Sequence, residues 1–301
     1  MNLDNLIQSA HEQNLHILHI VVRQQGRIIA EHEFSKEKPD QLWSVSKTFT
    51  SMAIGIAAHE GYFDIHDKLS TYFPAANHAK FDRLTIRDLL CMGTGQAACP
   101  LDKARQAGQG LDDIEALFFS EPIIYAPGTH FMYNNAATYM LSKLISLRTG
   151  ICVLDFLRPR VFAPLGIEDV QWEQDINGID FGCAGLHMGI HDLSKFGQLL
   201  LDEGRWNGKT LIPRSYIQEA TQKQIDTADF AAAFATTDHK SGYGYQLWMN
   251  AYPGSYRLDG LFGQYVVIIP QKQAVVTYVS NEPTNMTGIL ELTWKYIVEQ
   301  L

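Results

Sequence analysis

The chain has 301 residues, 46% of them apolar, so it can bury a large core as one big domain or two intertwined ones. Its formal net charge is −9 and its basic residues are scattered, which argues against nucleic acid or an anionic membrane as a main partner. The four cysteines have no C-x-x-C spacing, so neither a zinc site nor a redox dithiol is expected. No apolar run reaches the roughly eighteen residues of a membrane span, and the first residues are acidic and polar, unlike a signal peptide. The chain as given is therefore expected in the cytoplasm, unless an upstream segment was removed.

The chain begins with two predicted strands, His16–Arg23 and Arg27–Phe34, joined by a short polar turn that contains Gly26. A mostly apolar helix is predicted over Ser44–Glu60 and ends before Gly61. Because this helix is apolar nearly all round, we expect it to be buried against other elements.

Helical segments punctuated by prolines dominate residues 67–170, which we expect to form an inserted helical subdomain. The predicted helices from there on are Thr85–Cys91, Leu111–Phe119, Ala136–Thr149, Asp192–Gly204 and Thr287–Gln300, and the late strands are Ser241–Met249, Arg257–Pro270 and Ala274–Ser280. Strands lie at both ends of the chain with helices between them. Residues 1–66 and 171–301 are therefore predicted to share one antiparallel sheet in an α+β fold.

Ser44 and Lys47 form the first candidate catalytic pair, three residues apart at the start of the predicted helix. Residues at this spacing lie on one helix face, close enough for their side chains to touch. A serine is a weak nucleophile until a neighbouring base takes its proton, and a lysine can be that base if burial and the helix N-terminus lower its pKa. The alternative is a helix N-cap serine followed by an exposed lysine.

Tyr133 and Asn135 form a second candidate group, just before the helix predicted from Ala136. A phenol can relay a proton when a nearby cation lowers its pKa, and an amide can hold a substrate carbonyl. The alternative is a loop tyrosine followed by an N-cap asparagine.

The third candidate is the glycine-rich segment at residues 260–265. Gly260 would let a substrate approach the backbone closely, and an exposed N–H there could stabilise a developing oxyanion together with the N–H of Ser44. The alternative is a β-bulge with no chemical role.

Other chemistry-bearing residues give weaker signals. His187 and His191 have the spacing of zinc ligands on a helix, but Gly189 between them and the lack of an H-E-x-x-H pattern argue against a metal site. Trp248 and Phe262 could line a cleft, although isolated aromatic residues more often belong to a core.

Together these motifs resemble the class C β-lactamase-like serine hydrolases, in which Ser-x-x-Lys is the nucleophile motif. Ser44-Val45-Ser46-Lys47, Tyr133-Asn134-Asn135 and the late glycine-rich strand occur in the order and approximate separations of that family. Supporting stretches resemble it too: Leu84–Leu90, Tyr125–Gly128, Cys183–Leu186, Asp192–Gly197 and Trp206–Lys209.

The resemblance implies an antiparallel sheet flanked by helices, an all-helical subdomain beside it, and an active site between the two. It implies that Ser44 is the acylated nucleophile, Lys47 its base partner, Tyr133 a second proton-transfer group and Asn135 a substrate-orienting amide. The N–H of Leu261, after Gly260, would complete the oxyanion site.

One motif departs from the family pattern. β-Lactamases and penicillin-binding proteins of this family carry Lys-Thr-Gly or a close variant on the late strand, where this chain has Leu258-Asp259-Gly260 after Arg257. That departure puts recognition of a β-lactam carboxylate in doubt, although Arg257 could replace the cation. The segment looks closer to the branch of 6-aminohexanoate-dimer hydrolases and carboxylesterases.

The resulting prediction is a serine hydrolase that cleaves small esters or amides through an acyl-enzyme, with no metal or organic cofactor. Alternatives are a D-amino-acid peptidase or a β-lactamase of the same fold, and a non-catalytic binding or scaffold protein. Substrate choice is expected to lie in the loops Cys99–Asp112 and Gln224–Lys240.

Overall fold

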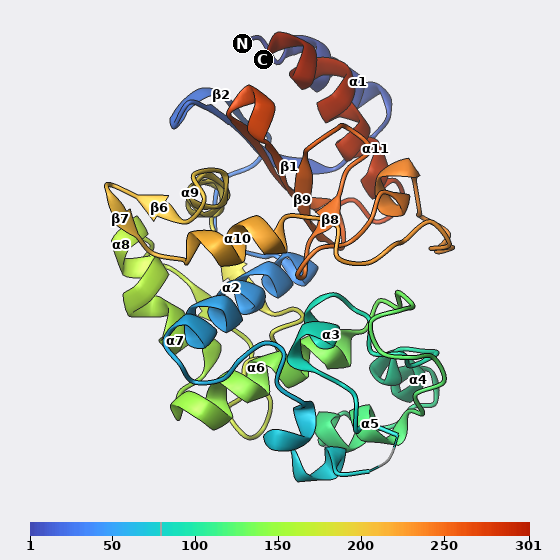
Figure 1. Cartoon of the computed structure of the whole chain (residues 1–301). Coiled ribbons are helices and arrows are strands. Elements are labelled where there is room, and N and C mark those ends of the chain that lie inside the picture. The colour runs from blue at the N-terminus through green and yellow to red at the C-terminus, as the bar shows by residue number, and fades with distance from the viewer. Residues whose placement is uncertain (79) are drawn as a thin grey trace.

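The computed structural model describes residues 1–78 and 80–301, and its centre is a six-stranded antiparallel sheet (Figure 1). The strand order is β2-β1-β11-β10-β9-β8. The strands are β1 (Ile17–Gln24), β2 (Arg27–Glu33), β8 (Trp248–Met249), β9 (Tyr256–Gly260), β10 (Gln264–Ile269) and β11 (Ala274–Ser280). The first and last strands of the chain thus pair in one sheet, and the predicted α+β fold is confirmed.

Helices cover both faces of this sheet. On one face, α1 (Asp4–Glu12) and α11 (Met286–Leu292) bury their apolar side chains against the strands, and the two chain ends lie together in Figure 1. On the other face lies α9 (Ile190–Leu201), where a Cβ added to Gly197 would stand only 2.6 Å from the side chain of Val266. The glycine therefore lets α9 pack directly on the sheet.

Helix α2 (Ser46–His59) is central to the molecule, with its residues from Ser46 to Ala57 all buried. The remaining helices are α3 (Ile86–Leu90), α4 (Pro100–Gln106), α5 (Ile114–Ser120), α6 (Asn135–Thr149), α7 (Val153–Leu157), α8 (Ala163–Leu165) and α10 (Arg214–Ala220). Figure 1 shows α3 to α7 on the side of α2 away from the sheet. The domain boundaries at residues 66/67 and 170/171 stay a prediction.

Short strand pairs connect these parts. The strands β3 (Asp40–Gln41), β5 (Leu186–Met188) and β4 (Gln171–Trp172) form one small sheet, and β6 (Arg205–Trp206) pairs with β7 (Lys209–Thr210). The first small sheet holds the chain that enters α2 beside the chain that follows Cys183.

Three predicted elements differ in the structure. Of Ser241–Met249 only the last two residues form a strand, since Gly242 and Gln246 turn the chain with φ of 117° and 61°. The predicted strand Arg257–Pro270 is two strands, β9 and β10, separated by a turn at Phe262, whose φ is 65°. The closing helix is regular only as far as Leu292 and then continues as a wider π turn and a 3₁₀ turn.

Among the described residues, no helix combines the length and the apolar composition that crossing a membrane requires.

Candidate active site

Ser44 lies in a 3₁₀ turn, Trp43–Val45, immediately before α2, so it precedes the α-helix that the sequence predicts to contain it. Trp43 adopts a left-handed conformation with φ 49°, which is costly for a bulky residue. The Oγ of Ser46 holds the turn by donating to the carbonyl of Trp43 at 2.6 Å, while it accepts from the N–H of Leu186 at 3.2 Å. The nucleophile candidate is therefore presented by a strained and braced turn.

Lys47 follows in the first turn of α2 and is almost completely buried. Its Nζ lies 3.1 Å from Ser44 Oγ, 2.7 Å from Asn135 Oδ1 and 2.7 Å from the carbonyl oxygen of Cys183. The two closer partners are oxygens that only accept, so they take both hydrogens of a neutral amine. The remaining lone pair is then directed at the hydroxyl of Ser44.

Burial lowers the pKa of Lys47 to about 8, because its charged form loses hydration that the surrounding groups only partly replace. A substantial share of the amine is therefore neutral near physiological pH. The geometry allows proton transfer from serine, and the neutral share of the amine that can accept the proton grows as the pH rises.

Tyr133 lies on the other side of this pair. Lys47 Nζ stands 5.0 Å above the centre of its ring, and its ring stacks on Trp248 with centroids 5.9 Å apart. Burial raises the pKa of Tyr133 above its ordinary range, although a hydrogen bond with Ser44 opposes this shift. The expected lowering by a nearby cation is not found. A neutral phenol suits proton donation rather than proton abstraction.

The two asparagines after Tyr133 have separate tasks. Asn134 is the N-cap of α6, its Oδ1 accepting from the N–H groups of Ala136 and Ala137 at 3.0 and 3.2 Å. Asn135, the first residue of α6, projects into the site and accepts from Lys47. Asn135 therefore orients the lysine, and its contact with substrate stays a prediction.

Gly260 ends β9 beside the turn that carries Ser44. A Cβ added to it would lie 2.5 Å from the carbonyl oxygen of Leu42, so the glycine permits close packing of two backbone segments. Leu261 follows and lines the same cavity as Ser44. Within the described residues, no hydrogen bond is donated by the N–H groups of Ser44 and Leu261. Their role as oxyanion donors stays a prediction.

The cavity beside Ser44 has a volume of about 110 Å³. It is lined by Ser44, Tyr133, Phe230, Phe234, His239, Trp248, Asp259, Leu261 and Met286. The loop Gln224–Lys240 thus contributes three side chains to it. A second cavity of about 500 Å³ opens next to Trp43 and Cys183, and the loop Cys99–Asp112 lines part of it. The role of both loops in substrate choice stays a prediction.

Arg257 does not replace the family cation, because it is fully buried and does not line the cavity. Its Nε donates to Asp259 Oδ2 at 2.8 Å, and its Nη1 donates to Asn250 Oδ1 at 2.8 Å. Its partner Asp259, two residues along the same strand, reaches the cavity instead. The charge presented at this point of β9 is therefore negative.

Three groups near the site were missed in the sequence. The carbonyl of Cys183 fixes Lys47, but a backbone acceptor carries no residue signature, and only the glycines at 182 and 185 mark the turn. Asp259 and His239 meet at 3.4 Å although they come from separate segments. The Asp preceding Gly260 was the signal available for the first of them.

The remaining candidates lie elsewhere. His187 contacts Glu173 at 3.0 Å, whereas His191 lies between Glu37 at 2.8 Å and Glu31 at 3.0 Å. The two histidines therefore have different partners. The four cysteines are free thiols, so no pair of them is bridged in the described structure.

Comparison with known proteins places this geometry in a family. The family model described as Beta-lactamase matches residues 3–293. The 6-aminohexanoate-dimer hydrolase of Paenarthrobacter ureafaciens is 22% identical over 277 residues, covering 86% of this chain and 71% of that protein. A beta-lactamase of Escherichia coli K12 is 22% identical over 302 residues, covering 85% and 79%.

A solved structure has the same fold. It is a Bacillus anthracis protein provisionally assigned as a 6-aminohexanoate-dimer hydrolase, 22% identical, with a TM-score of 0.82 over 100% of this chain and 83% of that one. Since the family match spans nearly the whole sequence, the chain belongs to the beta-lactamase family of hydrolases.

Proposed function

We propose that this protein is a serine hydrolase that cleaves small esters or amides through an acyl-enzyme on Ser44. The observation that carries the proposal is the buried Lys47 amine, 3.1 Å from Ser44 Oγ, with both of its other contacts made to acceptors. A binding protein would have no need of a desolvated amine held in this way, because burying it costs stability.

In the acylation step, neutral Lys47 takes the proton of Ser44 as Oγ attacks the substrate carbonyl. The N–H groups of Ser44 and Leu261 hold the oxyanion that forms. Tyr133, neutral because it is buried, delivers a proton to the departing alcohol or amine and recovers one from Lys47. These steps need no metal or organic cofactor.

In the deacylation step, a water molecule takes the place of the leaving group beside Tyr133. Lys47, neutral again, accepts its proton through the same lone pair as the water attacks the acyl ester. Ser44 is reprotonated when the carboxylic acid leaves. Asn135 and the carbonyl of Cys183 keep the amine in place through both steps.

The named relatives support the hydrolase class and leave the substrate open, since they include an aminohexanoate-dimer hydrolase, beta-lactamases and a penicillin-binding protein. A panel of short p-nitrophenyl esters, aminohexanoate-type amides, D-peptides and nitrocefin separates these substrate classes. The expected best substrates are the esters or the amides.

The nucleophile assignment is tested by labelling the purified protein with a fluorophosphonate probe and mapping the adduct. We expect labelling at Ser44, loss of labelling in Ser44→Ala, and a fall of several orders of magnitude in kcat. The control is Ser120→Ala, which removes a surface hydroxyl bonded only to the carbonyl of Leu117. If Ser44→Ala keeps more than about a tenth of the wild-type kcat, the assignment is wrong.

A further inference from the structure

The small cavity beside Ser44 has a composition that the hydrolysis of a neutral ester does not explain. Aromatic rings make most of its wall: Phe230 and Trp248 lie 5.2 Å apart between centroids, and Tyr133 stacks on Trp248 at 5.9 Å. Among its lining residues, Asp259 is the one carboxylate, and none is a lysine or arginine. An apolar pocket with a single negative group selects against anionic ligands.

Asp259 is held in the charged form. Its burial favours the neutral acid, but the charge of Arg257 and the hydrogen bond from His239 outweigh that effect and lower the pKa of Asp259 below its ordinary value. Both partners bind one oxygen, Oδ2, at 2.8 and 3.4 Å. In the described part of the chain, Oδ1 accepts no hydrogen bond, although Asp259 lines the cavity.

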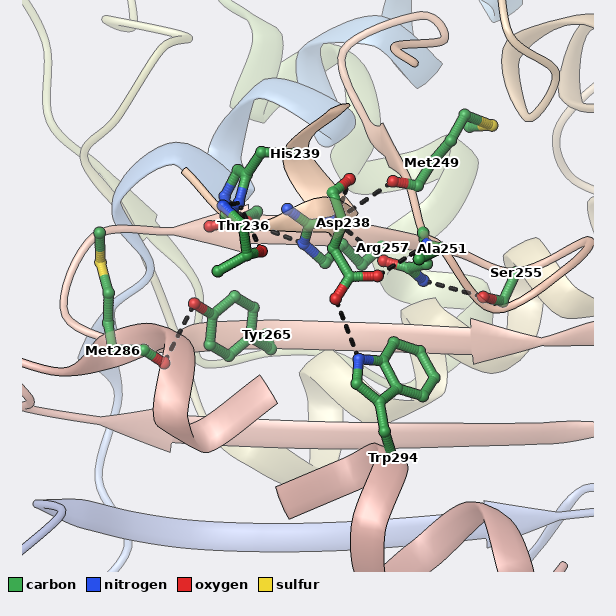
Figure 2. Close-up of polar contacts among 12 residues, drawn as sticks. Thr236, Asp238, His239, Met249, Ala251, Ser255, Arg257, Tyr265, Met286 and Trp294 are labelled. Carbon is green, nitrogen blue, oxygen red and sulfur yellow. Dashed lines mark hydrogen bonds and ion pairs between the residues drawn. The ribbon is translucent and has the colours of Figure 1, made fainter. Parts of the chain in front are cut away.

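Arg257 is not one of the residues that line this cavity. Its guanidinium lies beneath Trp248, with its carbon 5.6 Å from the ring centre, and its contacts go to Asp259, Asn250 and backbone carbonyls. Asp238 contacts the guanidinium through its backbone carbonyl, at 3.4 Å from Nη1. Its carboxylate accepts instead from the indole N–H of Trp294 at 3.1 Å and from the N–H of Ala251 at 2.7 Å (Figure 2). Arg257 and His239 both contact Oδ2 of Asp259, and the members of this cluster that line the cavity are the Asp259 carboxylate and the His239 ring.

Aromatic faces and a carboxylate together favour an organic cation. A ring attracts a cation through the negative potential of its face, and the effect grows when the site excludes water. We propose that this cavity, here named the ammonium cage (Tyr133, Phe230, Phe234, Trp248 and Asp259), binds a positively charged amine on the leaving group of the substrate. This inference rests on the proposed hydrolase function and specifies its substrate class.

Tyr133 indicates that the leaving group, and not the acyl part, of the substrate lies in the ammonium cage. The phenol is the group that would protonate the departing alcohol or amine, and it shares the cavity with Asp259. The acyl part of the substrate then lies outside this cavity. The substrates selected are thus esters or amides of short amino alcohols or diamines.

The test compares butyrylcholine with 3,3-dimethylbutyl butyrate, which has the same shape without the charge. We expect the wild type to prefer the cationic ester in kcat/KM, and Asp259→Asn to reduce that preference roughly tenfold or more, as expected for the loss of a charged partner. The matched control is Glu173→Gln, which removes one negative charge from the wall of the second cavity. A wild type that prefers the neutral ester, or an unchanged preference in Asp259→Asn, overturns the inference.

Two further measurements keep the test decisive. Asp259→Asn leaves a buried arginine unpaired and can unfold the protein, so a second experiment uses the wild type alone. Hydrolysis of the neutral ester is measured with tetramethylammonium chloride or with the same concentration of sodium chloride. Competitive inhibition by the organic cation alone is expected, and equal inhibition by both salts contradicts the ammonium cage. A further comparison uses p-nitrophenyl 4-aminobutyrate, which carries its cation on the acyl part, and uncharged p-nitrophenyl pentanoate. If the wild type prefers the aminobutyrate and Asp259→Asn loses that preference, the cation binds from the acyl side and the leaving-group assignment is overturned.

The outcomes separate the two proposals. If Ser44 is labelled and neutral esters are hydrolysed without any cation preference, the hydrolase function stands and the ammonium cage fails. If neither ester is hydrolysed and Ser44 is not labelled, the hydrolase function fails. Calorimetric titration of choline into Ser44→Ala then measures the cage directly, and absence of binding overturns it.

Discussion

Lys47 shows how a single side chain can be prepared for catalysis by what surrounds it. Its amine is buried, and its three contacts lie between 2.7 and 3.1 Å. Two come from distant segments, Asn135 on α6 and the carbonyl of Cys183 before β5. The role of Lys47 therefore depends on the tertiary structure as well as on its spacing from Ser44.

We expect Lys47→Arg to lower kcat by about three orders of magnitude, because a guanidinium keeps the charge and cannot accept a proton at accessible pH. The measurement is steady-state hydrolysis of the best ester, with circular dichroism to confirm the fold. Lys143→Arg is the control, since this lysine forms a surface ion pair with Glu115 at 2.6 Å. An active Lys47→Arg enzyme would mean that Lys47 acts as a fixed charge.

The pH dependence should follow the same amine. With the pKa of Lys47 near 8, the base is protonated and inactive below that pH and neutral above it, so kcat/KM should rise with pH and level off past about 8. Asn135→Asp places a carboxylate beside Nζ, which favours the ammonium form and should move the rising limb to higher pH. If the rising limb of the pH profile does not move in Asn135→Asp, the group that titrates there is not Lys47.

The sequence predicts these residues unequally. Ser44 and Lys47 follow from local spacing, because a helix brings such positions together whatever surrounds it. Asp259 and His239 become neighbours only when β9 and the turn at residues 237–240 fold against each other, and no local pattern records that event. The sequence suggests Arg257 as a cation at the site, whereas its partner Asp259 is the residue that lines the cavity.

At the level of elements, β9 and the turn before α2 form the working edge of the sheet. Gly260 is the point of closest approach, and the position of the N–H of Leu261 relative to Ser44 depends on it. The turn itself is held by contacts across this edge, for example between the rings of Trp43 and Phe262, 5.1 Å apart. Movement of the strand would therefore separate the two oxyanion donors.

Gly260→Ala tests this dependence. The added methyl would meet the carbonyl oxygen of Leu42, a backbone atom that cannot move aside alone, so β9 must shift. A shift of about 1 Å can cost a hundredfold in rate, and that loss is expected in kcat. In the control, Gly110→Ala, the nearest atom is the flexible side-chain oxygen of Asp112 at 3.1 Å. If both variants are equally active, Leu261 does not contribute to the oxyanion site.

Hairpins and long helices could be predicted from the sequence, whereas irregular connections could not. The hairpin β1–β2 turns at Gly26 as expected, because only two residues separate strands with a clear apolar pattern. The predicted strand from Ser241 fails because residues near Gly242 and Gln246 take left-handed conformations. The segment from Ser241 to Met249 is apolar because its turn is buried, as Tyr243 and Tyr245 are, and not because it pairs as a strand.

The whole molecule joins a family fold to a site whose charge differs from the family pattern. The fold and the family follow from several motifs that agree in order along the chain, and they were predictable for that reason. The substrate is not set by those motifs, since it depends on which side chains from separate segments line the cavity.

For this reason we expect poor hydrolysis of β-lactams. The chain has Leu258-Asp259-Gly260 where the family has Lys-Thr-Gly, so the cation that would hold the carboxylate of a β-lactam is missing. Asp259 also lines the cavity and would repel that carboxylate. A loss of about 3 kcal/mol corresponds to roughly two orders of magnitude in kcat/KM. The comparison is nitrocefin against p-nitrophenyl butyrate at one pH. Higher efficiency on nitrocefin would favour a β-lactamase instead.

The pairing of β1 with β11 has a consequence for how the protein is made. Ile17 pairs with Ser280, so the sheet cannot close until the residues of β11 have left the ribosome. Contacts so distant in sequence are slow to form, and the exposed edge of β1 is open to pairing with other chains while synthesis continues. Ser44 is made early, whereas β9 and Leu261 arrive late. A nascent chain thus carries the proposed nucleophile long before the proposed oxyanion strand, and any truncation before β11 should yield an inactive, aggregation-prone product.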